Sequence, residues 1–405
     1  MEKEFFFRML YSIMSFIKVR SIDMEKKKKK VKYFDYSLLI VLVFLICFGL
    51  VMLYSSSYYS AQRKFGDGTF YLKRQIIASI VSFLIMWGVS WIDYRIYYKY
   101  AGLIYCLSIP IMCAVWIPGL GIEAYGARRW IRLPVFGQMQ PAEVAKIAVI
   151  LFIPLILCRM GDKINTKKGL LYALACGVFQ ALIIRFVTDN LSTAIIVVGI
   201  TCIMIFVVHK NTSWFLGIAS AGVALTIIIQ QIGGRLLNSK IELGNFRSNR
   251  ILVWLNPELY ERSGGYQVMQ GFYAIGSGGF FGKGLGNGAQ KMLIPEPQND
   301  MILSIIAEEL GIFGVIVVLT LFGILLYRLM FIAQNAPDKY SSLIVTGIMA
   351  HIAIQVILNV CVVLNIVPTT GITLPFISYG GTALVFLMIE MGIALGISRK
   401  IKIED

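Results

Sequence analysis

The stretch SLLIVLVFLICFGLVMLYS, residues 37–55, contains no charged side chain and is long enough to cross the hydrocarbon core of a bilayer. The chain has 405 residues, of which 58% are hydrophobic and 15% charged, and its mean hydropathy is +0.75. Nine further apolar stretches follow, near residues 75–93, 100–118, 141–158, 169–187, 190–208, 213–231, 301–327, 340–362 and 375–397. The sequence therefore predicts an all-α membrane protein with about ten transmembrane helices.

The net charge of +16 is concentrated in places that indicate an orientation. A basic run, Lys26–Lys30 with Lys32, precedes the first span, and the loop at 159–168 and the C-terminal end are also basic. Because cytoplasmic segments carry an excess of Lys and Arg, we expect both termini in the cytoplasm and a multi-pass protein of the cell membrane. We expect no nucleic-acid binding, since no recognition element accompanies the charge. The expected domains are a basic cytoplasmic extension (1–36), a polytopic membrane domain (37–398) and a cytoplasmic tail (399–405).

This orientation places three loops outside the cell, near residues 56–74, 119–140 and 232–300. The last is a large external loop between spans seven and eight, and long loops of this kind are usually functional or disordered. Its glycine-rich run YAIGSGGFFGKGLG, residues 273–286, indicates a re-entrant or interfacial element.

Carboxylates gather where this loop becomes the eighth span, in KMLIPEPQNDMILSIIAEELG, residues 291–311. A carboxylate at the mouth of a membrane span is costly to desolvate, which makes Asp300 a candidate functional residue. Glu308 and Glu309 lie about two turns into the span, and a structural role for at least one of them is as well supported as a chemical one.

Cations stand near these carboxylates in the predicted external loops. The 119–140 loop contains Arg128 and Arg129, followed by Trp130, and the longest loop adds Arg247 and Lys291. Arginine forks match phosphate oxygens, so the set suits an anionic, lipid-linked substrate. Lipid headgroup binding by the arginine pair and an interfacial position for the tryptophan are the alternatives.

Two other segments carry candidate substrate-binding residues. Glu143 and Lys146 are three apart on one face of the fourth span, where they form either a substrate contact or an ion pair that tolerates burial. The run VPTTGITLPFISYGG, residues 367–381, adds the hydroxyl of Ser378. His209 and His351 have no neighbouring partner in the sequence, so we expect no zinc site.

Taken together, these motifs resemble the SEDS family of bacterial cell-wall polymerases, which includes FtsW, RodA and SpoVE. The resemblance covers about residues 36–398, and the motifs that carry it are GARRWI (126–131), QPAEVAK (140–146), RSNRILVWLNPE (247–258), GYQVMQGFYAIGSGGFFGKGLG (265–286), PEPQNDMILSIIAEELG (295–311) and PTTGITLPFISYGG (368–381). Gln298 and Asn299 stand where many members have histidine and threonine, and Asn190 stands where many have aspartate. The variants favour an FtsW-like chain.

The resemblance implies ten transmembrane helices and a peptidoglycan glycosyltransferase that polymerises lipid II on the outer face of the membrane. It places the essential aspartate at Asp300, the arginine and tryptophan at Arg129 and Trp130, and the glutamate and lysine at Glu143 and Lys146. It also implies a class B penicillin-binding protein, other divisome proteins and the nascent glycan strand as partners.

The residues leave some questions open. A divalent cation, Mg²⁺ or Mn²⁺, held by Asp300 and substrate phosphates is one way to stabilise the leaving group, and cationic side chains alone are the other. A lipid II flippase, a RodA-type elongation polymerase and a non-catalytic scaffold are the competing functions.

Overall fold

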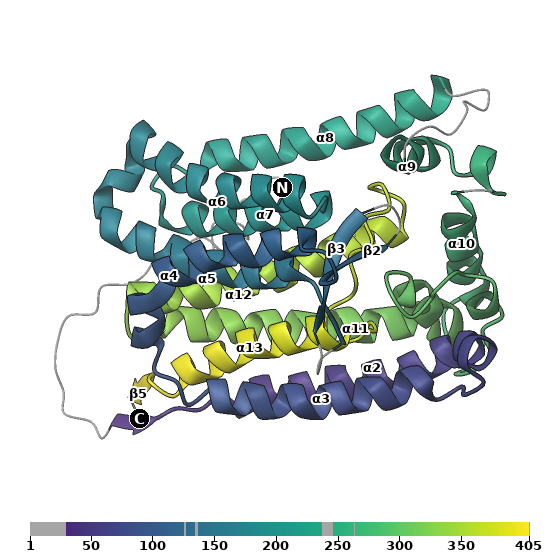
Figure 1. Cartoon of the computed structure of the whole chain (residues 1–405), viewed down its shortest axis with the longest axis horizontal. Coiled ribbons are helices and arrows are strands. Elements are labelled where there is room, and N and C mark those ends of the chain that lie inside the picture. The colour runs from purple at the N-terminus through teal and green to yellow at the C-terminus, as the bar shows by residue number, and fades with distance from the viewer. Residues whose placement is uncertain (1–29, 125–126, 134–136, 237–245, 263, 405) are drawn as a thin grey trace, which may run out of the picture.

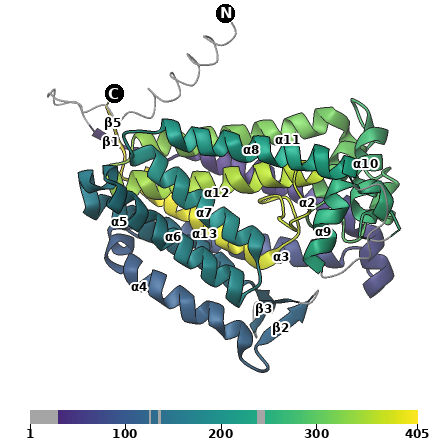
Figure 2. The ribbon, with the colours of Figure 1, turned by 90° about the horizontal axis from the view of Figure 1, so that it is seen from above.

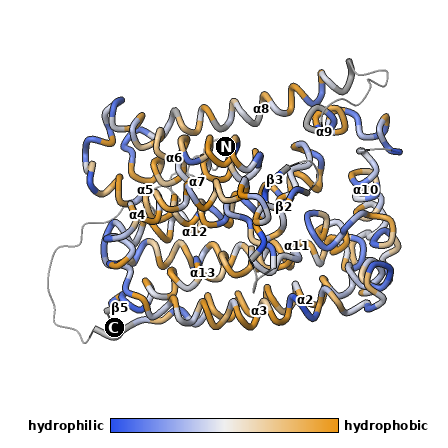
Figure 3. The backbone as a smooth tube through the Cα atoms, viewed as in Figure 1, coloured by the Kyte–Doolittle hydropathy of each residue, from blue (hydrophilic) through white to orange (hydrophobic). Residues whose placement is uncertain are grey.

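The computed structural model describes residues 30–124, 127–133, 137–236, 246–262 and 264–404 (Figure 1). Within this part of the chain, ten helices are long and apolar enough to cross a membrane, which confirms the predicted fold class of a multi-pass membrane protein. They are α2 (Tyr36–Phe65), α3 (Phe70–Val89), α4 (Tyr94–Cys113), α5 (Pro141–Met160), α6 (Lys167–Val187), α7 (Leu191–Val208), α8 (Ser213–Leu236), α11 (Ile302–Gln334), α12 (Lys339–Val363) and α13 (Gly381–Ser398). Hydrophobic residues fill the middle of these helices and hydrophilic residues mark their two ends (Figure 3).

The helices pack around α5, α12 and α13, which have the largest buried shares of their apolar windows. Helix α13 lies beside α3, α4 beside α5, α6 beside α7 and α11 beside α12 (Figure 2). Helix α8 runs along the edge of the bundle, and its described side chains are mostly exposed. One bond from Gln230 Nε2 to the carbonyl of Asn365, at 2.7 Å, ties α8 to the segment between α12 and α13.

The loops divide between two ends of the bundle. At one end, which we call the terminal end, strand β1 (Lys30–Lys32) pairs antiparallel with strand β5 (Lys402–Glu404). The opposite end, which we call the α10 end, contains the described residues between α2 and α3, α4 and α5, α6 and α7, α8 and α11, and α12 and α13 (Figure 1). The described residues of the three predicted external loops therefore lie at one end of the bundle. The proposed extension at 1–36 lies mostly outside the described residues.

The longest predicted loop is partly helical. It contains α9 (Phe246–Leu255), α10 (Tyr266–Gly278) and two short 3-10 turns, η3 (Glu258–Tyr260) and η4 (Gln290–Met292). The loop between α4 and α5 begins with the turn η1 (Ala114–Trp116) and forms a small antiparallel sheet of β2 (Gly121–Ala124), β3 (Ala127–Leu133) and β4 (Gly137–Met139). A further turn, η2 (Gly161–Asn165), joins α5 to α6 at the terminal end.

The tenth helix begins at Gly381, six residues later than the sequence predicted. The preceding segment is not helical because Pro375 cannot continue a helix and Phe376 adopts a φ of +63°. The segment thereby stays at the α10 end, where its backbone carbonyls can accept hydrogen bonds from other elements.

Helix α11 is interrupted at Gly311, whose backbone has φ +70° and ψ −171°. An added Cβ there would lie 2.2 Å from the carbonyl oxygen of Phe280, so only glycine fits. The break lets the glycine-rich segment after α10 pair with α11. Lys283 N donates to the carbonyl of Glu308 at 3.0 Å, and Ile312 N donates to the carbonyl of Gly279 at 3.0 Å.

The terminal end is held by a buried ion pair. Arg328 on α11 donates to the carboxylate of Asp35 at 2.7 Å and also bonds the hydroxyl of Tyr33. Asp35 caps α2 by accepting from Leu38 N at 2.9 Å. One carboxylate thus satisfies a helix N-terminus and fixes the start of α2 to the end of α11.

Candidate functional site

Asp300 lies immediately before α11, at the α10 end. Its Oδ1 accepts a hydrogen bond from Gln267 Nε2 on α10 at 3.1 Å, and its backbone carbonyl accepts one from Asn359 Nδ2 on α12 at 2.9 Å. Burial raises the pKa of Asp300 above the ordinary value, although its own backbone bond, the charge of Arg250 and Gln267 oppose the shift. A carboxylate with a raised pKa is a better proton acceptor near neutral pH, so the site is suited to general base chemistry.

Arg250 lies near this carboxylate, and Arg129, from a different segment, lies near Arg250. Arg250 Nη1 on α9 donates to the carbonyl of Thr369 at 3.0 Å, and Arg129 Nη2 on β3 donates to the carbonyl of Asp189 at 3.1 Å. Burial, and then the positive charge of Arg129, lower the pKa of Arg250, whereas Asp300 raises it. The two guanidinium groups thus repel one another, and an anionic ligand bound between them would relieve that repulsion.

Helix α9 is fixed in place by Trp254, one turn after Arg250. The indole Nε1 donates to the carbonyl of Asn365 at 3.2 Å, and Asn365 Nδ2 donates back to the carbonyl of Trp254 at 3.2 Å. This reciprocal pair explains how an arginine from the predicted long loop reaches the site. In the sequence, Arg250 is one of several cations of the long loop. Its position four residues before Trp254 is the one local pattern that could have indicated its role in the site.

The neighbours of Arg129 on β3 point away from it, because successive side chains of a strand alternate between faces. Arg128 is exposed, pairs with Glu123 at 3.3 Å and lies over the ring of Trp116 at 5.4 Å. Trp130 shares that face of the strand. The structure therefore brings Arg129 to the site and does not bring Arg128 or Trp130 with it.

Glu143 and Lys146 form the predicted pair on α5, at 2.8 Å, and both are buried. Lys146 Nζ also lies 3.0 Å from Nε2 of His351 on α12, and Nδ1 of His351 lies 2.8 Å from Glu390 on α13. His351, which has no partner near it in the sequence, is therefore paired on both sides of its ring in the folded protein. Its partners come from other helices, which no local pattern in the sequence could show.

The sequence predicted Lys291 as a substrate-binding cation, but in the structure its ammonium is bound within an ion-pair cluster. Its ammonium is buried and bonds Glu309 Oε1 at 2.8 Å, the carbonyl of Gly286 at 2.6 Å and Ser55 Oγ at 3.2 Å. Since an ammonium has three donors, these acceptors occupy all of them. Glu308 is likewise bonded to Lys283 at 2.8 Å. Lys291 and the Glu308–Glu309 pair thus fix the glycine-rich segment to α11.

Ser378 and Arg247 are the two remaining substrate-binding candidates. Ser378 is buried, and its Oγ accepts from Leu374 N at 2.9 Å, so the hydroxyl closes a turn within its own segment. Arg247 lies in the first turn of α9, and its side chain is outside the described part of the structure.

Among the residues that the structure describes, no group of three or more His, Cys, Asp or Glu side chains is arranged to hold a metal ion. Mg²⁺ commonly binds through one or two carboxylates, several waters and substrate phosphates. Asp300 can supply one such carboxylate.

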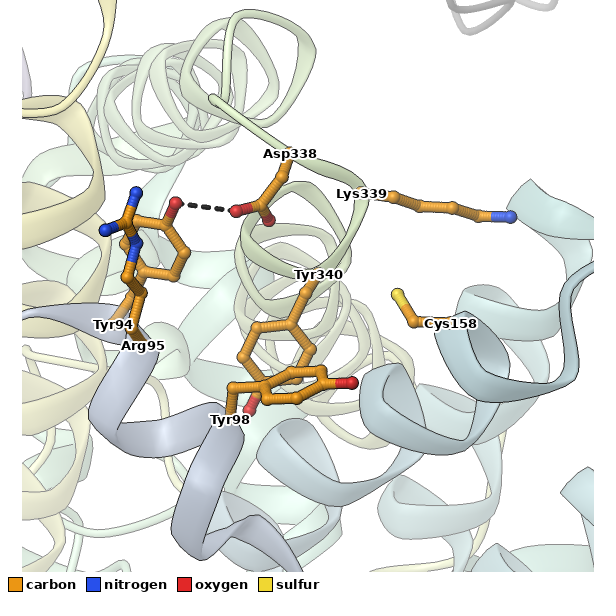
Figure 4. Close-up of a pocket in the computed structure, with 7 residues that line it drawn as sticks. All are labelled: Tyr94, Arg95, Tyr98, Cys158, Asp338, Lys339 and Tyr340. Carbon is orange, nitrogen blue, oxygen red and sulfur yellow. Dashed lines mark hydrogen bonds between the residues drawn. The ribbon is translucent and has the colours of Figure 1, made fainter.

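A cavity of about 460 Å³ lies elsewhere, beside the aromatic pair Tyr98–Tyr340 and the bond from the Tyr94 hydroxyl to Asp338 at 2.6 Å (Figure 4). Asp338 follows the end of α11, whereas Asp300 precedes its start. A helix of 33 residues spans roughly 50 Å, so this cavity is at the terminal end and is separate from the site.

The fold and the site define a multi-pass membrane protein with a carboxylate of raised pKa and two arginines at one end of its helical bundle. The family model of FtsW, RodA and SpoVE, described as "Cell cycle protein", matches residues 36–403. The chain belongs to this family.

Its relatives agree with this assignment. The chain is 36% identical to "Stage V sporulation protein E" of Bacillus subtilis over 90% of its length and 97% of that protein's. It is 37% identical to "Probable peptidoglycan glycosyltransferase FtsW" of Geobacter sulfurreducens over 92% and 97% of the two lengths. Among solved structures, it resembles a chain from a study entitled "Structural coordination of polymerization and crosslinking by a peptidoglycan synthase complex", with 25% identity, a TM-score of 0.71 and coverage of 91% and 98%. It also shares the fold of Thermus thermophilus RodA, with 23% identity, a TM-score of 0.61 and coverage of 91% and 97%.

Proposed function

We propose that this chain is a peptidoglycan glycosyltransferase that polymerises lipid II into glycan strands for septal synthesis. Family membership and the names of the FtsW relatives support this activity. The observation that carries it is the position of Asp300, a carboxylate of raised pKa beside the half-buried Arg250 at the end of a membrane bundle. A base next to cations is the arrangement that glycosyl transfer from a pyrophosphate requires.

The proposed orientation puts the α10 end outside the cytoplasmic membrane and both termini inside. Basic residues in several segments of the terminal end support this orientation. They include Lys163 between α5 and α6, Lys210 between α7 and α8, and Lys400 after α13. An excess of positive charge marks the cytoplasmic side of membrane proteins.

In the proposed reaction, the 4-hydroxyl of a lipid II sugar attacks the anomeric carbon of the growing strand. The new glycosidic bond forms as the bond from that carbon to the pyrophosphate oxygen breaks, with inversion. The hydroxyl proton passes to the carboxylate of Asp300, and the bonding electrons leave with undecaprenyl pyrophosphate. A positioned general base contributes roughly 10²–10⁴-fold to such a step.

The leaving pyrophosphate is proposed to bind Arg250 and Arg129. The backbone carbonyls of Thr369 and Asp189 accept hydrogen bonds from Arg250 and Arg129 and so orient the two guanidinium groups. The planar guanidinium fork matches the geometry of phosphate oxygens, which is why arginine commonly binds them. The alternative to the base role is that Asp300 would hold a divalent ion, which would neutralise pyrophosphate charge when bound.

A class B penicillin-binding protein is the proposed partner, together with other divisome proteins. The support is the similar chain from the peptidoglycan synthase complex, whose study concerns both polymerization and crosslinking. The partner would place a transpeptidase beside the emerging strand.

The test is polymerisation of lipid II by the purified protein, alone and with its partner, for the wild type and Asp300→Asn. The matched control is Asp162→Asn, the same chemical change at an exposed position of the terminal end. We expect polymerisation to be lost in Asp300→Asn and kept in the control. Normal product from Asp300→Asn would show that the assignment of the base is wrong.

One observation favours the flippase alternative, namely the buried charged residues of α5, α12 and α13, since charges inside a bundle often mark a transport path. Gel analysis of products separates the two activities. Movement of lipid II across vesicles without longer glycan would support transport.

A further inference from the structure

The side chains of Glu143, Lys146, His351 and Glu390 form one continuous chain through the interior of the bundle. The contacts join α5 to α12 and α12 to α13, with distances of 2.8, 3.0 and 2.8 Å. Each of the four residues is at most 8% exposed. Buried polar groups at such distances are directional contacts, so each member constrains the next.

The partners of His351 determine which ring nitrogen carries the proton. A lysine ammonium can only donate a hydrogen bond, so Nε2 of His351 must accept from Lys146. An ionised carboxylate can only accept, so Nδ1 must carry the hydrogen and donate it to Glu390. The carboxylate therefore fixes a neutral imidazole in the Nδ1–H tautomer, with its lone pair directed at Lys146.

The same face of α12 links this chain to the site. His351, Gln355 and Asn359 are spaced by four residues and share that face. Gln355 Nε2 donates to the carbonyl of Thr373 at 3.0 Å, and Asn359 donates to the carbonyl of Asp300. At 1.5 Å per residue, His351 lies roughly 12 Å along the helix from Asn359. Helix α12 thus holds the base and the buried lysine in one rigid frame.

We propose that His351 and Glu390 are positioning residues for Lys146. Glu143 and His351 take two of the three ammonium hydrogens, which fixes the direction of the third, and Glu390 acts one step further away by fixing the histidine tautomer. The inference rests on the proposed function and adds to it that the remaining hydrogen of Lys146 binds the anionic part of lipid II, which is one of the two roles that the sequence offered for this residue. Without the acceptor at Nε2, the ammonium would be held by Glu143 alone and could turn away from the substrate.

The first experiment measures the tautomer and needs no activity. The chain has two histidines, so ¹⁵N-histidine labelling gives two sets of ring signals, and His209→Gln assigns the other set. We expect Nδ1 of His351 to be protonated and Nε2 to be an acceptor in the wild type. The reverse tautomer would overturn the proposal.

The second experiment uses variants that keep or remove the acceptor. Both variants include Glu390→Leu, so that no buried carboxylate loses its donor. In that background His351→Gln places an amide oxygen near the position of Nε2, whereas His351→Leu, called the double variant below, leaves no polar group there. We expect the double variant to keep a wild-type melting temperature within a few degrees. Its kcat/KM for lipid II should fall by at least tenfold, and His351→Gln should recover most of that loss. His209→Gln is the control at full activity.

The outcomes separate this proposal from the proposed function. If the wild type polymerises lipid II, Asp300→Asn does not, and the double variant keeps full kcat/KM, then His351 and Glu390 only pack the core and the inference is wrong. An equal loss in His351→Gln and the double variant would also contradict it. If neither the wild type nor its complex polymerises lipid II, the proposed function fails, and the labelling result still decides the tautomer.

Discussion

The ion pair between Lys291 and Glu309 gives a sharp test of a structural role against a substrate-binding role. Lys291→Met removes the ammonium and leaves the Glu309 carboxylate fully buried. Ser55 Oγ, at 2.7 and 2.6 Å from its two oxygens, and the Gly286 amide, at 3.1 Å, remain as donors. Removing one partner of a buried pair costs about 3–5 kcal/mol, and these donors favour the lower end, about 3 kcal/mol.

The measurement is thermal unfolding of the purified protein in detergent. An unfolding entropy of roughly 2 cal/mol/K per residue over 405 residues converts about 3 kcal/mol into a fall in Tm of roughly 3–4 °C. Because helices stay partly folded in detergent, less entropy is gained and the fall would be larger. The double variant Lys291→Met with Glu309→Gln should regain most of the loss, since glutamine still accepts from Ser55.

The reasoning would be refuted by a particular pair of results. If Lys291→Met melts with the wild type while its KM for lipid II rises, the ammonium is available to substrate, as the sequence suggested. If the double variant is as unstable as the single one, the two groups do not interact as described.

Three other outcomes are expected. The pKa of Asp300 is raised in the folded state, so its contribution to stability is present below the ordinary aspartate pKa and is lost as pH rises through the raised value. Asp300→Asn should therefore increase Tm at neutral pH and leave it unchanged at acidic pH. Polymerisation by the wild type should rise with pH over the same interval. Arg129→Ala should lower kcat for lipid II roughly 10²-fold, whereas Arg128→Ala on the opposite strand face should stay near the wild type, and equal rates would remove Arg129 from the site. Gly311→Ala should abolish the yield of monodisperse protein in size-exclusion chromatography, because its Cβ would lie 2.2 Å from the Phe280 carbonyl oxygen. Gly323→Ala on the same helix, whose Cβ would have no atom within 4 Å, should purify normally. A normal yield for both variants would contradict the interruption of α11.

Local sequence patterns were sufficient to predict the membrane spans and to identify Asp300 as a candidate functional residue. Apolar length alone predicts a membrane helix, because a bilayer admits few other structures. The same patterns placed the end of the long loop beside the eighth span, which identified the carboxylate. They could not show that α9 and α10 fold within that loop, because the anchor of α9 is a bond between Trp254 and Asn365, far apart in sequence.

The candidate cations show the limit of sequence reasoning most clearly. Lys291 and Arg250 are both cations of the longest predicted loop, yet one is buried against Glu309 and the other lies beside Asp300. The difference depends on which acceptor each side chain meets after the helices pack. No residue type or spacing within that loop predicts which acceptor each side chain contacts in the folded protein.

By itself, the sequence determined the ten membrane helices, the side of the bundle that each loop occupies and the motif around Asp300, since these depend on hydropathy and chain order. Only the tertiary structure decided which charged groups become partners. It separated Arg129 from Arg128, placed Lys291 in an ion pair and joined His351 to Lys146 and Glu390. The physical reason is that a buried charge must find its counter-charge or donor in space, and those partners come from helices remote in sequence.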